Sequence, residues 1–370
     1  MRILAIDMGT GTQDILLFDS SGPVENSLKM VMPSATEIAA RRIRQATRQS
    51  RAVVLTGVTM GGGPCTWALD EHLKAGLRAY ATPQAAQTFD DDLAAVRAMG
   101  VTIVSDDEAR GLNDARQMHR ELVEPIELAD LDLTAIRRAL TSFEMEGDFD
   151  GLALACLDHG AAPPGYSDRL FRFEHLRRVV ERRNDLRAFA YLPHELPAYL
   201  TRARAMLSCV DTDVPLVFLD TGPAAALGAL QDPLVAQQDQ QLVINLGNMH
   251  ALAFHLAGTH IYSLYEHHTS LLSTEEIESL SEGLVAGTLR HEDVFDRHGH
   301  GVFYADSPAT RQPFLAITGP QRGKLKDSRL KPYFAVPHGD MMLSGCFGLV
   351  WAFAEKYPQH SEEIEARLRP

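Results

Sequence analysis

Apolar residues along the chain gather into short runs at strand spacing, separated by turns of small residues or by longer helical patterns. Ile3–Ile6 and Ile15–Phe18 are two such runs on either side of the turn Gly9–Thr12, and this pattern predicts a β-hairpin. Leu242–Leu256 repeats the plan of strand, glycine turn and strand. A repeated hairpin predicts two related half-domains.

Strands and helices alternate along the rest of the chain, which indicates an α/β protein. Residues 66–120 read as helices joined by short strands, the clearest being Val101–Val104. Proline and alanines in Thr221–Gly228, and spaced glycines in Gly339–Val350, predict two helices that permit close contact with another helix. The remaining predicted strands are Ala52–Leu55, Gly151–Leu157, Leu216–Leu219 and Phe314–Ile317, and the remaining predicted helices are Ser34–Ser50, Leu131–Thr141, Leu170–Arg187 and Tyr199–Cys209.

Composition narrows the class of protein and of partner. The chain has 370 residues, 45% apolar and 23% charged, which is typical of a soluble globular protein with two domains or one large divided domain. Its formal net charge of −14 argues against nonspecific binding to nucleic acid or to anionic membranes. A small anionic substrate remains compatible, because such a ligand needs only local positive potential.

The four cysteines lie far apart and form no Cys-x-x-Cys unit, so the sequence shows neither a zinc ribbon nor a clustered iron–sulfur motif. This usage predicts a reduced, cytoplasmic protein. The N-terminus runs directly into the first hairpin and does not read as a signal peptide. The apolar stretch Met341–Phe353 is too short to span a bilayer.

The first turn has the composition of a phosphate-binding loop. Gly9 and Gly11 lack Cβ atoms and let a backbone approach a phosphate closely, while Thr10 and Thr12 offer hydroxyl groups to its oxygens. Asp7, at the end of the first strand, is placed to hold Mg²⁺ directly or through water. The alternative is an ordinary N-terminal hairpin with a Gly-Thr turn.

A second candidate site follows the strand Gly151–Leu157. Asp158 and His159 stand at its end, where open α/β sheets place chemistry. The alternative is a helix-capping aspartate beside an exposed histidine. The three glycines at 61–63 also follow a strand and indicate close approach of a ligand or of another backbone, or serve only the turn.

Histidines are concentrated between residues 260 and 300. Imidazole is a common ligand of zinc, iron and nickel, so the stretch suggests a transition-metal site. Its candidate ligands are Glu266, His267, His268, His298 and His300. Adjacent His267 and His268 point to opposite faces if the segment is a strand, and scattered surface histidines are the alternative.

Five segments, in order, resemble the motifs of the actin-like ATPase superfamily, which includes sugar kinases, acetate kinase, actin and heat-shock chaperones. Asp7-Met-Gly-Thr-Gly-Thr12 resembles its first phosphate motif and Asn245-Leu-Gly-Asn-Met-His250 its second. Thr221–Gly228 and Ser344–Gly348 resemble its two connecting helices, and Thr318-Gly-Pro-Gln-Arg322 falls where its adenosine motif belongs. The resemblance extends over nearly the whole chain.

The resemblance implies a two-domain actin-like, ribonuclease H-like fold with a duplicated core and an interdomain cleft. Domain I would comprise residues 1–235, with 344–370 packing back on it, and domain II residues 236–343. ATP and Mg²⁺ would bind at the base of the cleft. The residues implied in cofactor binding are Gly9, Thr10, Gly11, Thr12, Asn245, Gly247, Asn248, His250, Gly319 and Arg322.

The chain departs from the superfamily pattern at two positions. The second phosphate motif usually begins with Asp, and here Asn245 has no charge to hold magnesium or polarise water. Pro320 follows Gly319 where paired glycines are usual. The chain also resembles a branch of the superfamily labelled as activators of pyruvate formate-lyase. A radical-type activating enzyme needs a Cys-x-x-x-Cys-x-x-Cys cluster, which the sequence lacks.

The leading functional hypothesis is therefore an ATP-dependent phosphotransferase or ATPase. Asp7 would anchor magnesium, and Asp158, with His159 as the alternative, would be the base for an acceptor hydroxyl or water. Asn245 favours a second hypothesis, a nucleotide-responsive regulatory protein. A metal-dependent enzyme using the histidines is the third. The expected partners are a nucleotide and a small molecule, and the sequence leaves a homo-oligomer or protein partner open.

Overall fold

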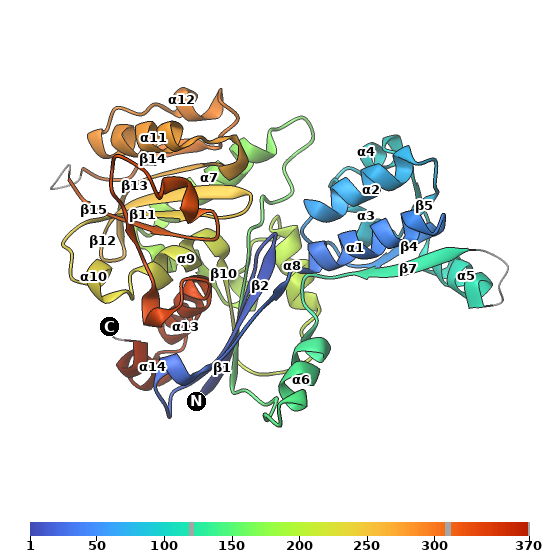
Figure 1. Cartoon of the computed structure of the whole chain (residues 1–370), viewed down its shortest axis with the longest axis horizontal. Coiled ribbons are helices and arrows are strands. Elements are labelled where there is room, and N and C mark those ends of the chain that lie inside the picture. The colour runs from blue at the N-terminus through green and yellow to red at the C-terminus, as the bar shows by residue number, and fades with distance from the viewer. Residues whose placement is uncertain (118–121, 308–311, 369–370) are drawn as a thin grey trace.

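The computed structural model describes residues 1–117, 122–307 and 312–368, and these form three β-sheets with helices around them (Figure 1). The first sheet has the order β3-β2-β1-β8-β10-β9 and the second β14-β13-β12-β11-β15-β16. The strands of the first sheet are β1 (Arg2–Met8), β2 (Thr12–Asp19), β3 (Leu28–Pro33), β8 (Gly151–Cys156), β9 (Ala190–Tyr191) and β10 (Leu216–Asp220). Those of the second are β11 (Gln241–Leu246), β12 (His250–Ala257), β13 (His260–His268), β14 (Gly301–Tyr304), β15 (Phe314–Thr318) and β16 (Tyr333–Phe334).

These two sheets share one plan. In each, a hairpin (β1–β2 or β11–β12) is extended by a third antiparallel strand (β3 or β13), while the first hairpin strand pairs in parallel with β8 or β15 on its other side. A further parallel strand, β10 or β16, follows in each case. The duplicated core predicted from the two hairpins is confirmed, and the architecture is the two-domain actin-like fold.

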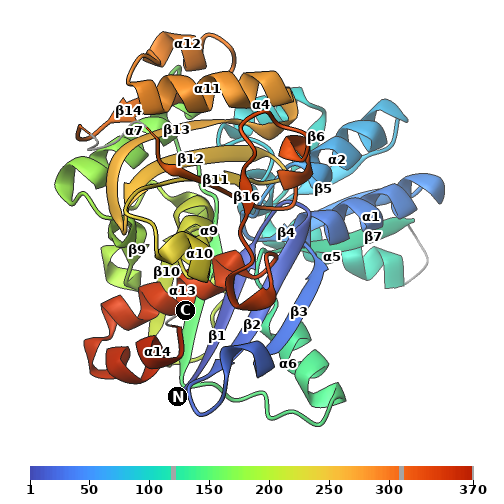
Figure 2. The same ribbon diagram turned by 60° about the vertical axis from the view of Figure 1, so that its left-hand side comes forward.

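Two helices lie between the sheets and join the halves, α9 (Thr221–Ala229) and α13 (Ser344–Lys356) (Figures 1 and 2). Their buried side chains belong to one hydrophobic cluster that also includes residues of both sheets, such as Ile3 in the first and Phe254 in the second. Glycines let the two backbones touch: a Cβ on Gly228 would lie 1.7 Å from the Ser344 carbonyl oxygen, and one on Gly348 would lie 2.0 Å from that of Ala224. The close helix contact predicted for both segments is therefore present.

The third sheet, with the order β6-β5-β4-β7, is inserted between β3 and β8 and lies on the right in Figure 1. All its strand pairs are parallel, and it has a hydrophobic cluster of its own. Its elements are α1 (Ala35–Arg48), β4 (Ala52–Gly57), α2 (Pro64–Lys74), β5 (Ala79–Ala81), α3 (Pro83–Ala86), α4 (Leu93–Ala98), β6 (Val101–Ile103), α5 (Asp106–Gln117) and β7 (Val123–Leu128). The sequence indicated helices and short strands here but not a separate sheet.

The remaining helices pack around the duplicated sheets or, as α14 (Ser361–Leu368) does, against α13. They are α6 (Leu133–Ser142), α7 (Asp168–Arg182), α8 (Thr201–Ser208), α10 (Pro233–Ala236), α11 (Thr274–Ala286), α12 (His291–Phe295) and α14. Within the described ranges, every helix is too short or too polar to cross a bilayer. The domain boundaries at 235/236 and 343/344 stay a prediction. The ranges predicted for domains and elements include residues 118–121, 308–311 and 369–370, which lie outside the described residues.

Candidate functional site

A cavity of about 410 Å³ lies where both hairpin turns, the loop after β8 and the third sheet converge. Most of the residues predicted from sequence to form a site line this cavity. Those that line it are Asp7, Gly9, Thr10, Thr12, Asp158, His159, Asn245, Gly247, Asn248, His250, Glu266 and Gly319. Those that do not are Gly11, His267, His268, His298, His300 and Arg322.

The first turn places two carboxylates on neighbouring strands at the cavity. The Gly9 N–H donates to the Thr12 carbonyl oxygen at 2.9 Å and closes the turn. Asp7 and Asp14 are then directly opposite each other in the β1–β2 register, and both are buried. The Thr221 hydroxyl donates to Asp7 Oδ1 at 2.8 Å, whereas Asp14 Oδ1 is buried with no hydrogen-bond partner among the described residues.

These two carboxyl groups are costly to ionise where they lie. Burial, reinforced by the charge of Asp220, raises the pKa of Asp7 to about 7, although the Thr221 hydrogen bond opposes the shift. Burial, followed by the charge of Asp7, raises the pKa of Asp14 to about 8. Both shifts have the sign expected for paired acids that lack a compensating cation.

The second turn faces the first. Its closing hydrogen bond, from the Gly247 N–H to the His250 carbonyl oxygen, is also 2.9 Å long. A Cβ added to Gly11 would lie 2.5 Å from Asn248 Nδ2, so the two turns approach each other closely. Asn245 is buried at the end of β11 and lines the cavity. The Gly11 backbone therefore packs against the opposite turn, although this residue is outside the cavity lining.

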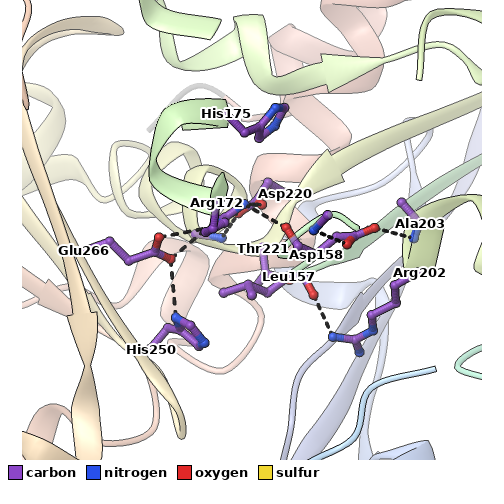
Figure 3. Close-up of polar contacts among 12 residues, drawn as sticks. Leu157, Asp158, Arg172, His175, Arg202, Ala203, Asp220, Thr221, His250 and Glu266 are labelled. Atoms are coloured by element: carbon purple, nitrogen blue, oxygen red, sulfur yellow. Dashed lines mark hydrogen bonds and ion pairs between the residues drawn. The ribbon is translucent and has the colours of Figure 1, made fainter. Parts of the chain in front are cut away.

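The loop after β8 is held by the carboxylate of Asp158. Its Oδ1 accepts a hydrogen bond from the Gly160 N–H at 2.8 Å, and its Oδ2 accepts one from the Ala203 N–H at 2.9 Å (Figure 3). The carboxylate thus anchors the loop to α8. His159, between these anchored residues, lines the cavity. The role of either residue as a base stays a prediction.

Four imidazoles gather beside the second turn. The ring centroid of His250 lies 5.0 Å from that of His159, 5.0 Å from that of His268 and 4.9 Å from that of His300. Burial, with the neighbouring imidazoles, lowers the pKa of His159 well below its usual range. Burial likewise lowers the pKa of His300 to about 3 and that of His268 to about 4. These lowered pKa values favour the neutral form of His159, His268 and His300, the form that binds metals.

A buried ion-pair network lies beside His250, one of these four histidines (Figure 3). Arg172 is fully buried and pairs with both carboxylate oxygens of Asp220, at 3.0 Å for the Nη2–Oδ1 pair. It also contacts Glu266, at 3.2 and 3.3 Å. Burial opposes ionisation of Glu266, but the Arg172 guanidinium together with His300 and His250 outweighs burial and holds the pKa of Glu266 well below its usual range. Glu266 Oε1 lies 3.4 Å from His250 Nδ1.

Two of the predicted metal ligands lie apart from this group. His267 points to the opposite face of β13, where its ring packs against Gly299 and its Nδ1 lies 3.2 Å from the His268 carbonyl oxygen. His298 is exposed, in a left-handed turn with φ of 67°. The candidate ligands Glu266, His267, His268, His298 and His300 therefore do not all lie together, and metal binding by any of them stays a prediction. The alternation of side chains along β13, already visible in the sequence, separates His267 from His268.

Sequence reasoning missed residues that line the cavity from elsewhere. Asp14 could have been identified from the sequence, because the hairpin register alone places it opposite Asp7. No sequence pattern indicated Arg202, which reaches the cavity from α8. Its guanidinium pairs with Asp130 at 2.7 and 3.0 Å. His250 was predicted only as a phosphate contact, and its meeting with His159 depends on how the two sheets pack.

Comparison with solved structures finds remote likenesses. A protein from Listeria monocytogenes described as "a putative N-acetylmannosamine kinase" is 10% identical, with 96% of this chain and 100% of that one covered and a TM-score of 0.34. The ROK hexokinase from Thermus thermophilus is 12% identical, with 70% and 48% covered and a TM-score of 0.24. An exopolyphosphatase-like protein is 10% identical, with 99% and 90% covered and a TM-score of 0.28.

Comparison by sequence gives a family. No curated protein matches the chain. Residues 60–324, from the third sheet to the turn after β15, match one family across most of the chain. The chain therefore belongs to the family described as "Putative pyruvate format-lyase activating enzyme (DUF1786)".

Proposed function

We propose that the protein is an ATP-dependent phosphotransferase that acts on a small molecule in the cavity between the two turns. The observation that carries this proposal is the pair of glycine turns that face each other across the cavity, with Asp7 and Asp14 buried beside one of them. Phosphoryl transfer depends on positioning and charge neutralisation more than on covalent chemistry by the protein. The two opposed turns would position the phosphates, and a cation site beside them would neutralise their charge.

The carboxylate pair fits Mg²⁺, which prefers oxygen ligands. Asp14 Oδ1 lacks a partner among the described residues, and burial is the main reason that the pKa values of Asp7 and Asp14 are raised. Arg202 is the only Arg or Lys among the described lining residues, and Asp130 already pairs with it. Asp7 and Asp14 would hold Mg²⁺, which would neutralise phosphate charge in this acidic cavity.

The turns also fit a polyphosphate and a nucleoside. Backbone N–H groups and the Thr10 and Thr12 hydroxyls line the first turn, and Asn248 lines the second. Gly319, in the turn after β15, has φ of 95°, and a Cβ there would lie 2.5 Å from the Leu246 carbonyl oxygen. Gly319 and Pro320 line the cavity, and adenine and ribose would lie against this turn. The acceptor would lie on the side of the loop that carries His159.

Asn245 favours a second candidate, a regulatory protein that binds nucleotide with little turnover. The neutral amide stands at the position equivalent to Asp7 in the second sheet. An amide contacts phosphate or ribose by hydrogen bonds without polarising a water molecule. Binding without ADP release would be the signature of this second function.

The activity named in the family description requires different chemistry from the one this chain carries. Activation of pyruvate formate-lyase by a radical route uses an iron–sulfur cluster held by clustered cysteines. Cys65, Cys156 and Cys346 are buried separately, and burial raises the pKa of each thiol. In the part of the chain that the structure describes, no group of three potential metal ligands includes a cysteine.

Calorimetry with ATP, with and without Mg²⁺, followed by ADP-release assays with a panel of small hydroxylated acceptors, tests the proposal. Gly11→Val should weaken Mg²⁺–ATP binding by about tenfold or more, because its side chain would displace the flexible end of Asn248 and enter the gap between the turns. Gly22→Val is the matched control, since a Cβ there has open space. Unchanged affinity in a folded Gly11→Val protein would remove the nucleotide from this site.

A further inference from the structure

Three imidazoles from distant parts of the chain converge at one edge of the cavity. His159 follows β8, His250 begins β12, and His300 immediately precedes β14. One potential ligand nitrogen from each lies within 4.8 Å of the others. This spacing suits three ligands around one metal ion, since zinc–nitrogen bonds are about 2.0–2.1 Å long.

The ring nitrogens of these histidines lack the hydrogen bonds that buried polar groups normally have. Both nitrogens of His300, which is fully buried, and Nε2 of His159 have no partner among the described residues. Buried polar atoms are nearly always paired in native proteins, because leaving one unpaired costs about 1–3 kcal/mol. One unpaired nitrogen from His159 and one from His300 are therefore available for a ligand that the two rings share.

The surroundings of His250 have the arrangement typical of a metal-bound histidine. Glu266 Oε1 lies 3.4 Å from His250 Nδ1, and Arg172 holds Glu266 in place. His250 Nδ1 has no hydrogen bond among the described residues, and Glu266 is the carboxylate nearest to accept one. A ligating histidine usually directs its second ring nitrogen to a carboxylate, which fixes the ring and makes the other nitrogen a better donor. Glu266 and Asp220 share the single guanidinium of Arg172, so this network has net negative charge beside the imidazoles.

We infer that His159, His250 and His300 bind a divalent first-row transition metal ion of the Zn²⁺ type. Imidazole nitrogens favour such an ion over Mg²⁺, which prefers oxygen. His159 and His250 line the cavity, whereas His300 binds from the buried side. The fourth position faces the cavity, as in catalytic rather than structural zinc sites.

This site goes beyond phosphotransfer and does not depend on nucleotide binding. It also replaces the predicted role of His159 as a base, because a ring nitrogen that binds a metal cannot accept a proton. The metal and the carboxylate pair Asp7–Asp14 would stand at different parts of one cavity, each with donors suited to a different ion.

Spectroscopic titration of the full-length, metal-stripped protein with Co²⁺, followed by Zn²⁺ displacement, tests the inference in the absence of ATP. The wild-type protein should bind one Co²⁺ with the intense visible absorption of a four-coordinate site. His300→Ala and His159→Ala should each weaken binding by at least about tenfold. His268→Ala is the matched control: its ring lies 4.7 Å from that of His300, yet it is outside the ligand group, so binding should persist.

Circular dichroism of each stripped variant checks that it folds, and His159→Ala, in a partly exposed loop, decides the question if His300→Ala does not. Wild-type protein that fails to bind Co²⁺ or Zn²⁺, or folded His159→Ala that binds as well as wild type, would overturn the inference. Gly11→Val should retain Co²⁺ binding. Wild-type protein that binds Co²⁺ but not ATP would count against the phosphotransferase proposal and leave the metal site standing.

Discussion

The two hairpin turns have the same backbone and different side chains. Each is closed by an N–H to carbonyl hydrogen bond of 2.9 Å between equivalent residues. By register, Asp7 corresponds to Asn245 and Asp14 to Leu252, and the Thr12 position corresponds to His250. The first turn thus carries two carboxylates, and the second an amide, an apolar side chain and an imidazole.

This difference shows which parts of a duplicated scaffold are constrained. Gly9 and Gly247 are equivalent, and a Cβ on either would lie 3.0 or 2.9 Å from the carbonyl oxygen that closes its own turn, so the turn itself favours glycine there. The residues beside the turns are free to change, because only the ligand fixes their chemistry. We infer that the two turns suit different ions. The oxygen donors beside the first turn suit Mg²⁺, and the nitrogen donors beside the second suit a transition metal.

The largest effect is expected at the contact between α9 and α13, which holds the two halves of the molecule together. Gly348→Ala places a Cβ 2.0 Å from the Ala224 carbonyl oxygen, an atom of the backbone that cannot move aside. The free energy of unfolding should fall by about 3 kcal/mol, the upper range for an overpacked core. Chemical denaturation measures it, with Gly323→Ala as the control because a Cβ there has open space. Equal stability of the two variants would mean that the helices separate easily.

Removing a carboxylate from the first turn should have the next largest effect. Asp14→Asn keeps the shape of the side chain but removes a charge that would hold Mg²⁺. We expect Mg²⁺-dependent ATP affinity to fall about tenfold to a hundredfold, while Mg²⁺-independent binding changes little. Calorimetry at fixed ATP and varied Mg²⁺ measures this. Asp91→Asn, at an exposed lining position, is the control, and an equal loss there would exclude a specific role for Asp14.

Adding a carboxylate to the second turn sharpens the same comparison. Asn245→Asp makes the end of β11 resemble the end of β1, and a charge that polarises water should raise Mg²⁺-dependent ATP turnover about tenfold, or about 1.4 kcal/mol of barrier. Steady-state ADP release measures it. Asn248→Asp, within the turn itself, should give no such increase. If turnover of Asn245→Asp stays at the wild-type level, the neutral amide is not what limits the reaction.

The smallest expected effect concerns acid stability and distinguishes the two sheets. His255 on β12 is fully buried at the position equivalent to Leu17 on β2, and burial lowers its pKa from 6.5 to about 4. Between these pH values the unfolded chain binds more protons than the folded one, so this histidine's contribution to stability is complete above about pH 6.5 and falls towards pH 4.

His255→Leu should therefore lose less stability than wild type between about pH 7 and pH 5. The difference between the two free energies of unfolding is the quantity to compare, because any loss of packing affects both equally. Urea titrations at the two pH values measure it. An identical pH dependence in the variant and the wild-type protein would assign the acid sensitivity to other groups.

Local patterns were enough to predict part of this site. The Gly9–Thr12 turn and Asp7 are contiguous, so sequence alone indicated their chemistry. Asp14 was within reach, since a hairpin of known register places it opposite Asp7. Two strands of the third sheet, β4 and β6, were predicted, but strand pairing is not encoded in local sequence patterns, so the separate sheet was missed.

The histidine group illustrates what sequence cannot give. His159 and His250 belong to different sheets, and His300 comes from a loop before β14. Their meeting depends on how α9 and α13 hold the sheets together and on which face of each strand turns inward. The dense stretch of histidines drew attention to His267 and His298, which lie elsewhere, because proximity in sequence was taken for proximity in space.

The inserted third sheet has a consequence for how this protein could change over evolution. Its loops supply one wall of the cavity, including Gly61–Gly63 and Gln87–Phe89, while its core is largely separate from that of the duplicated sheets. Substitutions or length changes in those loops can therefore reshape the cavity without disturbing either turn. The duplicated halves can stay fixed while this module diversifies, so one scaffold can present cavities of different shapes.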